Sequence, residues 1–298
     1  MFACYSPAYF MHLGPGHPFP MEKYPRTFER LIREGTLHPS RVIQPSPLPD
    51  GSLAVAHSPS YVHRVTHGLL SPQEVRRLGF PWSPPLVRRA RSAAGGTLIA
   101  SHIALTEGIG VNLAGGSHHA FPDRGEGFCV FNDLAVAIRT LQADRRIRRA
   151  AVIDCDVHQG NGTAAMFQDD PDVLTFSIHG ANNYPYCQVP STKDIALPDG
   201  TQDDVYMEAL DAHLPGLLRT FQPELVLYVA GVDPYRADRL GRLKLTLEGL
   251  ERRDALVLDL CQQRRIPVVI TFAGGYAENL DDTVEAHCQT VRAARALL

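Results

Sequence analysis

The sequence predicts an α/β fold: one mainly parallel β-sheet with helices on both faces. Short apolar runs rich in Val, Ile and Leu are bounded by Gly, Pro or Asp, as is typical of strands buried on both faces. Longer segments with helical periodicity separate these runs, and this alternation indicates parallel strands joined by helices. No linker rich in Pro, Gly or Ser divides the 298 residues. We therefore expect residues 1–298 to form a single domain.

The expected elements follow one another along the chain. Five apolar runs predict strands, at residues 111–113, 150–154, 173–178, 225–231 and 267–272. Three segments with apolar residues at helical spacing predict helices between them, at residues 133–141, 205–218 and 247–263. Two proline-rich stretches, 45–49 and 81–85, should form ordered surface loops.

The composition excludes several classes of protein. With 44% hydrophobic and 20% charged residues, the chain differs from disordered chains, which are poor in apolar residues and strongly charged. Its 29 basic and 32 acidic residues give a net charge of -3, so no cationic field attracts nucleic acid. The best apolar run, residues 225–232, is far shorter than the roughly 20 residues of a membrane-spanning helix. We expect neither a nucleic-acid nor a membrane partner, and the oligomeric state stays open.

Two features indicate a cytoplasmic protein. The six cysteines are scattered and include no CxxC pair, which predicts reduced thiols rather than a disulfide framework. Residues 1–10 lack the basic and apolar regions of a secretory signal. We therefore expect the cytoplasm as the compartment of this chain.

Polar clusters follow four of the five expected strands. They are the segments 115–119 (GGSHH), 154–158 (DCDVH), 231–233 (GVD) and 274–276 (GGY). The carboxyl ends of parallel strands meet at one edge of a sheet, where ligands bind. We therefore expect the four loops to converge on a single site.

Asp156 and His158 are candidate metal ligands. Their i, i+2 spacing places both side chains on the same side of an extended segment. Asp233 is a candidate third ligand, and an Asp2His set leaves an open position for water, as catalytic zinc or ferrous sites require. Taken alone, a DxDxH pattern is more often an incidental polar strand end. The neighbouring clusters therefore decide its meaning.

His118, His119 and Tyr276 could supply the other groups of a hydrolytic site. The two histidines follow Gly-Gly-Ser and so lie on a loop rather than on an apolar helix face. Two imidazoles can serve as general base and electrostatic partner for a metal-bound water. The double glycine before Tyr276 lets the backbone approach closely, so the phenol could meet a developing oxyanion.

The order of these blocks carries a resemblance to a known family. The blocks are 16–18 (GHP) with Lys23, 115–119 (GGSHH), 127–133 (GFCVFND), 154–162 (DCDVHQGNG), 177–179 (SIH), 231–233 (GVD) and 274–276 (GGY). In this order the chain resembles the zinc-dependent histone deacetylases and their bacterial acetoin-utilisation and acetylpolyamine amidohydrolase relatives. The segments 159–162 and 238–241, with the short length, look most like the class IV branch and its bacterial homologues. The resemblance implies the single-domain arginase/deacetylase-like fold.

The resemblance also implies a role for each matched residue. The metal ligands would be Asp156, His158 and Asp233, holding Zn2+ or else Fe2+. The general base would be His119, with His118 assisting, and Tyr276 would polarise the scissile carbonyl.

Two further sites follow from the same resemblance. A structural K+ or Na+ would lie beneath the metal, held by Asp154, which also pairs with His118, by Ser177, and by the main-chain carbonyls of Asp156, His158 and Ile178. An acyl-lysine tunnel would be lined by Phe128, Tyr184, Gly127 and Gly275. Core packing is the competing interpretation of the two aromatic residues.

The sequence departs from the family pattern in two places. Asn161 stands where many members have an Asp behind the second histidine; it can accept the same hydrogen bond from Nδ1 but adds no negative charge. Class I members hold the substrate backbone with an Asp on a rim loop. No Asp lies between Gly51 and Pro122, which puts tight recognition of a peptide backbone in doubt.

Four functions compete on this evidence. The first is a metal-dependent hydrolase that removes an acyl group from lysine side chains of a peptide or protein. The second acts on acylated polyamines or other small amides. An arginase-like enzyme with two manganese ions would need a carboxylate where this chain has Gly160. A non-catalytic protein would be expected to lack a ligand or Tyr276.

Overall fold

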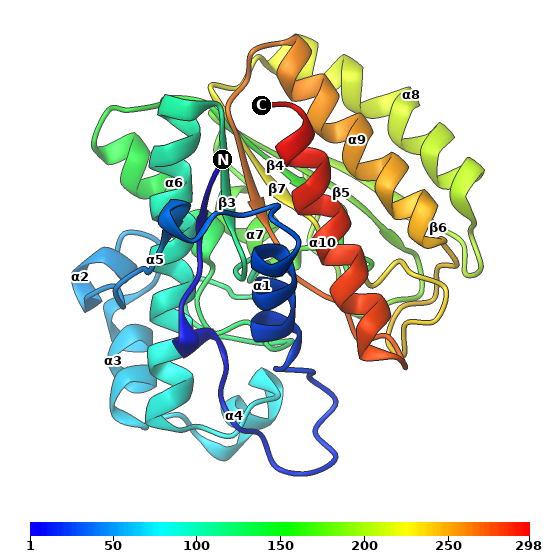
Figure 1. The fold of residues 1–298 in the computed structure, drawn as a ribbon. Helices are drawn as coiled ribbons and strands as arrows, with labels where there is room; N and C mark the ends of the chain where they lie inside the picture. The colour runs from blue at the N-terminus through cyan, green and yellow to red at the C-terminus, as the bar shows by residue number, and fades with distance from the viewer.

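A computed structural model describes all residues, 1–298, and contains a single eight-stranded sheet (Figure 1). The strand order is β2-β1-β3-β8-β7-β4-β5-β6, and every neighbouring pair is parallel. The strands are β1 (Phe2–Cys4), β2 (Val42–Ile43), β3 (Ile109–Asn112), β4 (Ala150–Asp154), β5 (Val173–Gly180), β6 (Lys193–Leu197), β7 (Leu225–Val229) and β8 (Val268–Thr271). The parallel order confirms the expected sheet.

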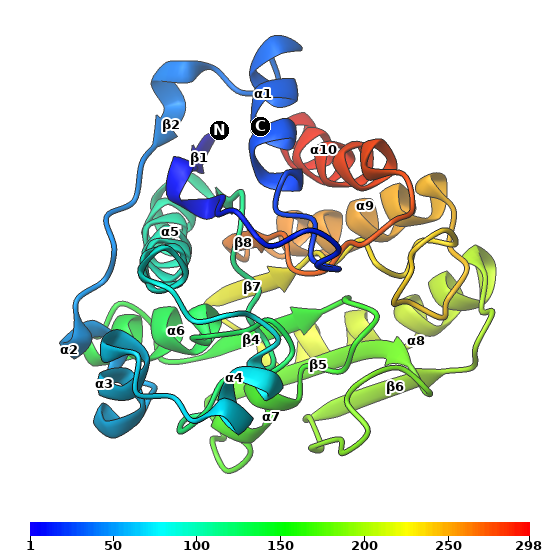
Figure 2. The ribbon, with the colours of Figure 1, turned by 90° about the horizontal axis from the view of Figure 1, so that it is seen from below.

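Helices cover both faces of this sheet (Figures 1 and 2). Helices α5 and α6 pack on one face, and α8, α9 and α10 pack side by side on the other, with α1 against α10. The α-helices are α1 (Lys23–Arg33), α2 (Asp50–Leu53), α3 (Pro59–His67), α4 (Pro72–Leu78), α5 (Pro84–Glu107), α6 (Asp133–Ala143), α7 (Asn161–Phe167), α8 (Asp203–Phe221), α9 (Leu247–Gln263) and α10 (Leu280–Ala296). The two faces enclose separate apolar clusters of 60 and 18 buried residues, so the central strands are buried on both sides. No helix is long and apolar enough to cross a membrane.

All five expected strands and all three expected helices are present, with ends shifted by a few residues at most. Residues 81–85 were expected to form a loop, and for Pro84 and Pro85 this expectation was wrong, because these two residues begin helix α5. Proline is well tolerated in the first turn of a helix, where its missing N–H needs no partner, and the Ser83 hydroxyl caps that turn.

The carboxyl ends of the central strands place the candidate site. In register, Asp154 at the end of β4 lies between Ser177 of β5 and Val229 of β7. Strand β8 pairs with both β7 and β3, so the segments that follow β3, β4, β7 and β8 emerge at the same edge. The four polar clusters named above are these segments, and their convergence confirms the expected meeting of loops.

Candidate active site

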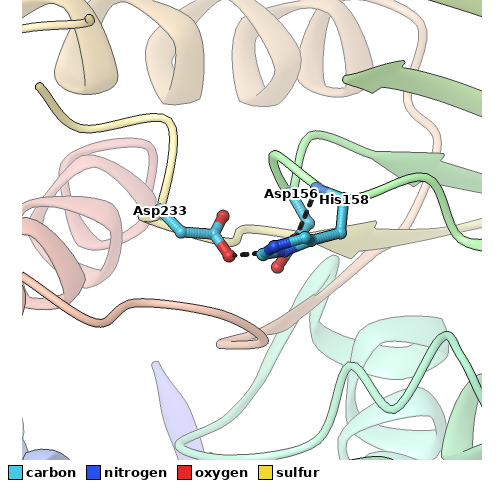
Figure 3. A group of neighbouring side chains, drawn as sticks. All are labelled: Asp156, His158 and Asp233. Carbon is cyan, nitrogen blue, oxygen red and sulfur yellow. Dashed lines mark hydrogen bonds and ion pairs between the residues drawn. The ribbon is translucent and has the colours of Figure 1, made fainter. Parts of the chain in front are cut away.

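Asp156, His158 and Asp233 meet at the carboxyl edge of the sheet. Their potential ligand atoms all lie within 4.8 Å of one another, and all three residues are buried. Figure 3 shows the His158 imidazole between the two carboxylates: its Nδ1 is 2.9 Å from Oδ1 of Asp156 and 3.1 Å from Oδ2 of Asp233. Main-chain N–H groups hold the carboxylates in place, with Val157 donating to Asp233 and Gly274 donating to Asp156.

The charges of these three residues fit a divalent cation. Burial, and then the charge of Asp156, raise the pKa of Asp233 to about 7. Burial lowers the pKa of His158, but the two carboxylates outweigh it and raise that pKa to about 10. Apart from the 3.1 Å contact with Nδ1 of His158, the buried Oδ2 of Asp233 has no hydrogen-bond partner. The two buried carboxylates and the imidazole therefore share a proton. A divalent metal ion in its place would neutralise both acids. Oxygen and nitrogen donors of this kind suit zinc or ferrous iron.

His118 forms a buried pair with Asp154. Its Nδ1 donates to Oδ2 of Asp154 over 2.6 Å, and its exposed fraction is 3%. Burial lowers the pKa of His118, yet Asp154 and Asp156 raise it to about 9. A side chain at Gly160 would contact the same Asp154 oxygen, so this position has no room for the extra carboxylate of a two-metal site.

His119 has a neutral partner instead. Its Nδ1 donates to Oδ1 of Asn161 over 2.8 Å, which leaves Nε2 without a proton. Burial, followed by the neighbouring charges of His118 and His158, holds the pKa of His119 well below its usual range. An imidazole that stays neutral near pH 7 can accept a proton, whereas His118 with its raised pKa is charged there.

Glu126, which no sequence motif marks, lies behind this pair. Its carboxylate accepts from Nδ2 of Asn161 (2.8 Å) and from the Tyr184 hydroxyl (3.0 Å). These bonds fix the Asn161 amide with its oxygen toward His119. A local sequence signal was absent, because Glu126 lies 35 residues from Asn161 and 58 from Tyr184.

Tyr276 reaches the same pocket from the loop after β8. Its main-chain N–H donates to Asp238 over 2.6 Å, and its side chain is 6% exposed. Burial, followed by the charges of Asp233 and Asp156, raises the pKa of Tyr276 well above the usual tyrosine range, so the phenol keeps its proton. Gly275 has φ of +148°, and a Cβ there would lie 2.5 Å from Val232, so this close packing requires glycine.

A cavity of about 350 Å³ leads from the surface to His119, His158 and Tyr276, and its walls include Phe128 and Tyr184. The Tyr184 ring stands edge-on to His119, with ring centres 5.0 Å apart. Gly127 lines the same cavity and adopts φ of +55°, whereas Gly275 does not line it. Three of the four residues expected to line the tunnel, Phe128, Tyr184 and Gly127, therefore line this cavity. Gly275 precedes Tyr276 in the chain and is not part of the cavity wall.

The residues expected to hold a monovalent cation lie close together. Asp154 and Ser177 are partners across β4 and β5, and Oδ1 of Asp154 accepts from the main-chain N–H of Asp156. The Ser177 hydroxyl is hydrogen-bonded to Nδ1 of His179. Ile178 follows in β5, and the cation itself stays a prediction.

Arg253 is another residue that no local sequence pattern marks, and it is fully buried. The side chain belongs to α9, has no exposed area and contacts the loops that carry Asp156 and Asp233. Its Nη1 donates to the carbonyls of Cys155 and Gly231, close before the candidate ligands Asp156 and Asp233. Asp254, the next residue, accepts from its Nε at 2.9 Å.

Comparisons with known proteins agree with this geometry. A sequence profile described as the histone deacetylase domain matches residues 17–291. An uncharacterized protein of Picosynechococcus is 45% identical over 98% of this chain and 97% of its own length. Histone deacetylase 2 of Arabidopsis thaliana is 32% identical over 92% of this chain and 74% of its own. The acetoin utilization protein AcuC of Staphylococcus aureus is 29% identical, covering 87% and 72%. The crystal structure of the HDA15 HD domain superposes with a TM-score of 0.83 at 24% identity, covering 99% of this chain and 88% of that one.

Proposed function

The chain belongs to the histone deacetylase family, and from this premise we propose that it is a metal-dependent amide hydrolase that removes an acyl group from lysine side chains. One observation carries the proposal: the cavity between Phe128 and Tyr184 ends at His158, His119 and Tyr276. A passage with aromatic walls suits the extended apolar stem of an acyl-lysine. The groups at its base suit hydrolysis of the amide bond.

Asp156, His158 and Asp233 are the proposed ligands of one zinc ion, with ferrous iron as the alternative. When bound, such an ion supplies Lewis acidity, which polarises the scissile carbonyl and lowers the pKa of a coordinated water. The buried Oδ2 of Asp233, whose one polar contact is with the other candidate ligand His158, supports this assignment. Asp154, Ser177 and the main-chain carbonyls of Asp156, His158 and Ile178 are the proposed ligands of a structural K+ or Na+.

The side chains divide the chemistry. His119, neutral and oriented by Asn161, accepts a proton from the attacking water at Nε2. His118, charged beside Asp154, stabilises negative charge that develops in the transition state. Tyr276 donates its phenol proton in a hydrogen bond to the carbonyl oxygen as that oxygen gains charge.

Residues 1–298 would form one catalytic domain of the class IV type. Its substrate is an acylated lysine in a peptide or protein, with acetyl or longer acyl groups. The alternative is an acylated polyamine or another small amide, which the missing rim Asp keeps open.

The test is turnover of three substrates by one zinc-loaded preparation: an acetyl-lysine peptide, a long-chain acyl-lysine peptide and an acetylated polyamine. Hydrolysis of either peptide, with release of the free acid, supports the proposal. Turnover of the polyamine alone selects the alternative, and no turnover of any amide contradicts both.

A further inference from the structure

The outer end of the cavity carries two arginines and no carboxylate. Arg77 and Arg242 line it together with Asn182, Tyr186 and Leu240, all of which are exposed. Arginine has only hydrogen-bond donors and stays charged at any pH of interest. The mouth therefore presents positive charge to whatever surrounds the acylated side chain.

The backbone fixes the two arginines next to opposite walls of the tunnel. The carbonyl of Arg77 accepts from the N–H of Gly127 (3.2 Å), and the next residue, Leu78, accepts from Phe128 (2.9 Å). Gly79 ends helix α4, and its Cα approaches the Phe128 ring so closely that a Cβ would lie 2.8 Å from it. The last turn of α4 is thus bonded to the Phe128 wall, and Arg77 stands at its rim.

Arg242 is fixed in the same way beside the other wall. Its main-chain N–H donates to Oδ1 of Asn183 (3.2 Å), the residue before Tyr184. Asn183 is buried, and its Nδ2 donates to the carbonyl of Leu240 (2.8 Å), which closes the loop around this wall. One arginine therefore stands beside each aromatic wall.

Little of this positive charge is neutralised within the protein. Arg77 has no carboxylate within 4.0 Å. Arg242 pairs with Asp199 at 3.3 Å, but side-chain exposures of 55% and 42% make this a weak pair. The nearby acids face inward: Glu126 accepts from Asn161 and Tyr184, and Asp238 accepts from three main-chain N–H groups.

We propose that this mouth selects acyl-lysine substrates that carry a carboxylate beside the acylated side chain. The inference rests on the proposed function and narrows its substrate class. The carboxylate comes from a neighbouring Asp or Glu of a peptide, or from the α-carboxylate of a C-terminal acyl-lysine. An acylated polyamine brings additional ammonium groups to the same place and is repelled.

The test compares acetyl-lysine peptides of one length that differ only beside the acetyl-lysine. Four carry Glu, Gln, Lys or a free terminal carboxylate there, and acetylated spermidine is the fifth substrate. The expected order of kcat/KM is carboxylate above Gln above Lys and spermidine, with about threefold to fivefold per exposed charge pair. Raising the salt concentration should compress these differences, because exposed pairs are screened.

Single variants locate the effect. Arg77→Gln and Arg242→Gln should each lower kcat/KM for the Glu peptide, mainly through KM, by a larger factor than for the Gln peptide. Asp199→Asn should strengthen the preference for Glu by freeing Arg242. Arg219→Gln is the control, since it removes one exposed charge far from the cavity. Arg219 lies in the last turn of α8, which leads into the start of β7, whereas the cavity lies at the carboxyl ends of the strands.

Two results would overturn the inference: equal kcat/KM for the Glu, Gln and Lys peptides, or a Glu preference that Arg219→Gln reduces as much as the mouth variants do. In both cases acetyl-lysine is still hydrolysed and the proposed function stands. If no peptide is hydrolysed at all, the proposed function itself fails.

Discussion

The side-chain oxygen of Asn161 lies 2.8 Å from Nδ1 of His119 and is held there by Glu126 on its other side. This neutral contact orients the imidazole without placing a charge against it. By contrast, His118 has the carboxylate of Asp154 in the corresponding position. Adjacent histidines therefore take opposite protonation states, one suited to accept a proton and the other to stabilise negative charge.

Replacing Asn161 by Asp should raise the pKa of His119, because a carboxylate would stabilise the imidazolium. His119 must be neutral to act as base, so activity is lost as the pH falls through its pKa. Raising that pKa moves the acidic limb of the kcat/KM profile to higher pH. The measurement is the full profile of wild type and Asn161→Asp with the same saturating metal. A limb that stays in place or moves to lower pH would show that residue 161 does not tune His119.

Glu126 should matter through the orientation of Asn161. Glu126→Ala removes the acceptor of the Asn161 amide nitrogen and so loosens the orientation of the amide, which then rests on the Gly162 N–H alone. Loss of such an outer partner commonly lowers activity about 10- to 100-fold. Glu126→Gln keeps an acceptor oxygen and should retain more of kcat. Tyr184→Phe is the matched control, since it removes the other hydrogen bond to Glu126 but leaves the Asn161 contact. Wild-type kcat in Glu126→Ala would remove Glu126 from this role.

The parallel sheet and the proximity of Asp156, His158 and Asp233 could be predicted from the sequence because their signals are local. Apolar strands buried on both faces end in short polar motifs, and the strand ends of a parallel sheet must converge. Strand β6 escaped prediction because Lys193 to Ala196 are half-buried or exposed and lack a continuous apolar run. Helix α5 was missed because its many small residues are buried against the sheet and give little amphipathic contrast.

Glu126 and Arg253 were missed for another reason. Each makes its contacts with residues far away in the sequence, and a lone Glu or Arg in a loop or helix is ordinarily solvated. Only the assembled fold shows that Glu126 faces Asn161 and that Arg253 is buried beneath the ligand loops.

Asp233→Asn should abolish metal binding together with amide hydrolysis. The variant keeps the shape of the side chain but removes one of two carboxylate charges from the ligand set. We expect metal analysis to find one zinc ion per wild-type chain and close to none in the variant. Thermal unfolding with and without chelator is an independent measure, because a ligand that binds only the folded state raises its stability. Full hydrolysis by a metal-free variant would refute the metal assignment.

Tyr276→Phe should lower kcat far more than it changes KM. The phenol meets an oxygen that becomes negative only in the transition state, so its loss is felt there and not in substrate binding. Removal of one such donor commonly costs about 10²- to 10³-fold in kcat. Steady-state kinetics with one acetyl-lysine peptide measure the split, and bound zinc should be unchanged because Tyr276 is not among the ligands. An unaltered kcat would exclude Tyr276 from the reaction.

Arg253 and its neighbour Arg252 provide a matched pair for stability. Arg253 is fully buried, pairs with Asp254 and donates to the carbonyls of Cys155 and Gly231. Arg252 is exposed and pairs with Asp204 at 3.1 Å on the surface. Arg253→Ala removes the only cation paired with the buried Asp254 carboxylate and the donor to two buried carbonyls, which should lower the free energy of unfolding by about 3–5 kcal/mol. Arg252→Ala in the same helix should change it by less than about 1 kcal/mol. Urea unfolding of both variants measures the difference. Equal effects would mean that the buried guanidinium does not stabilise the two ligand loops.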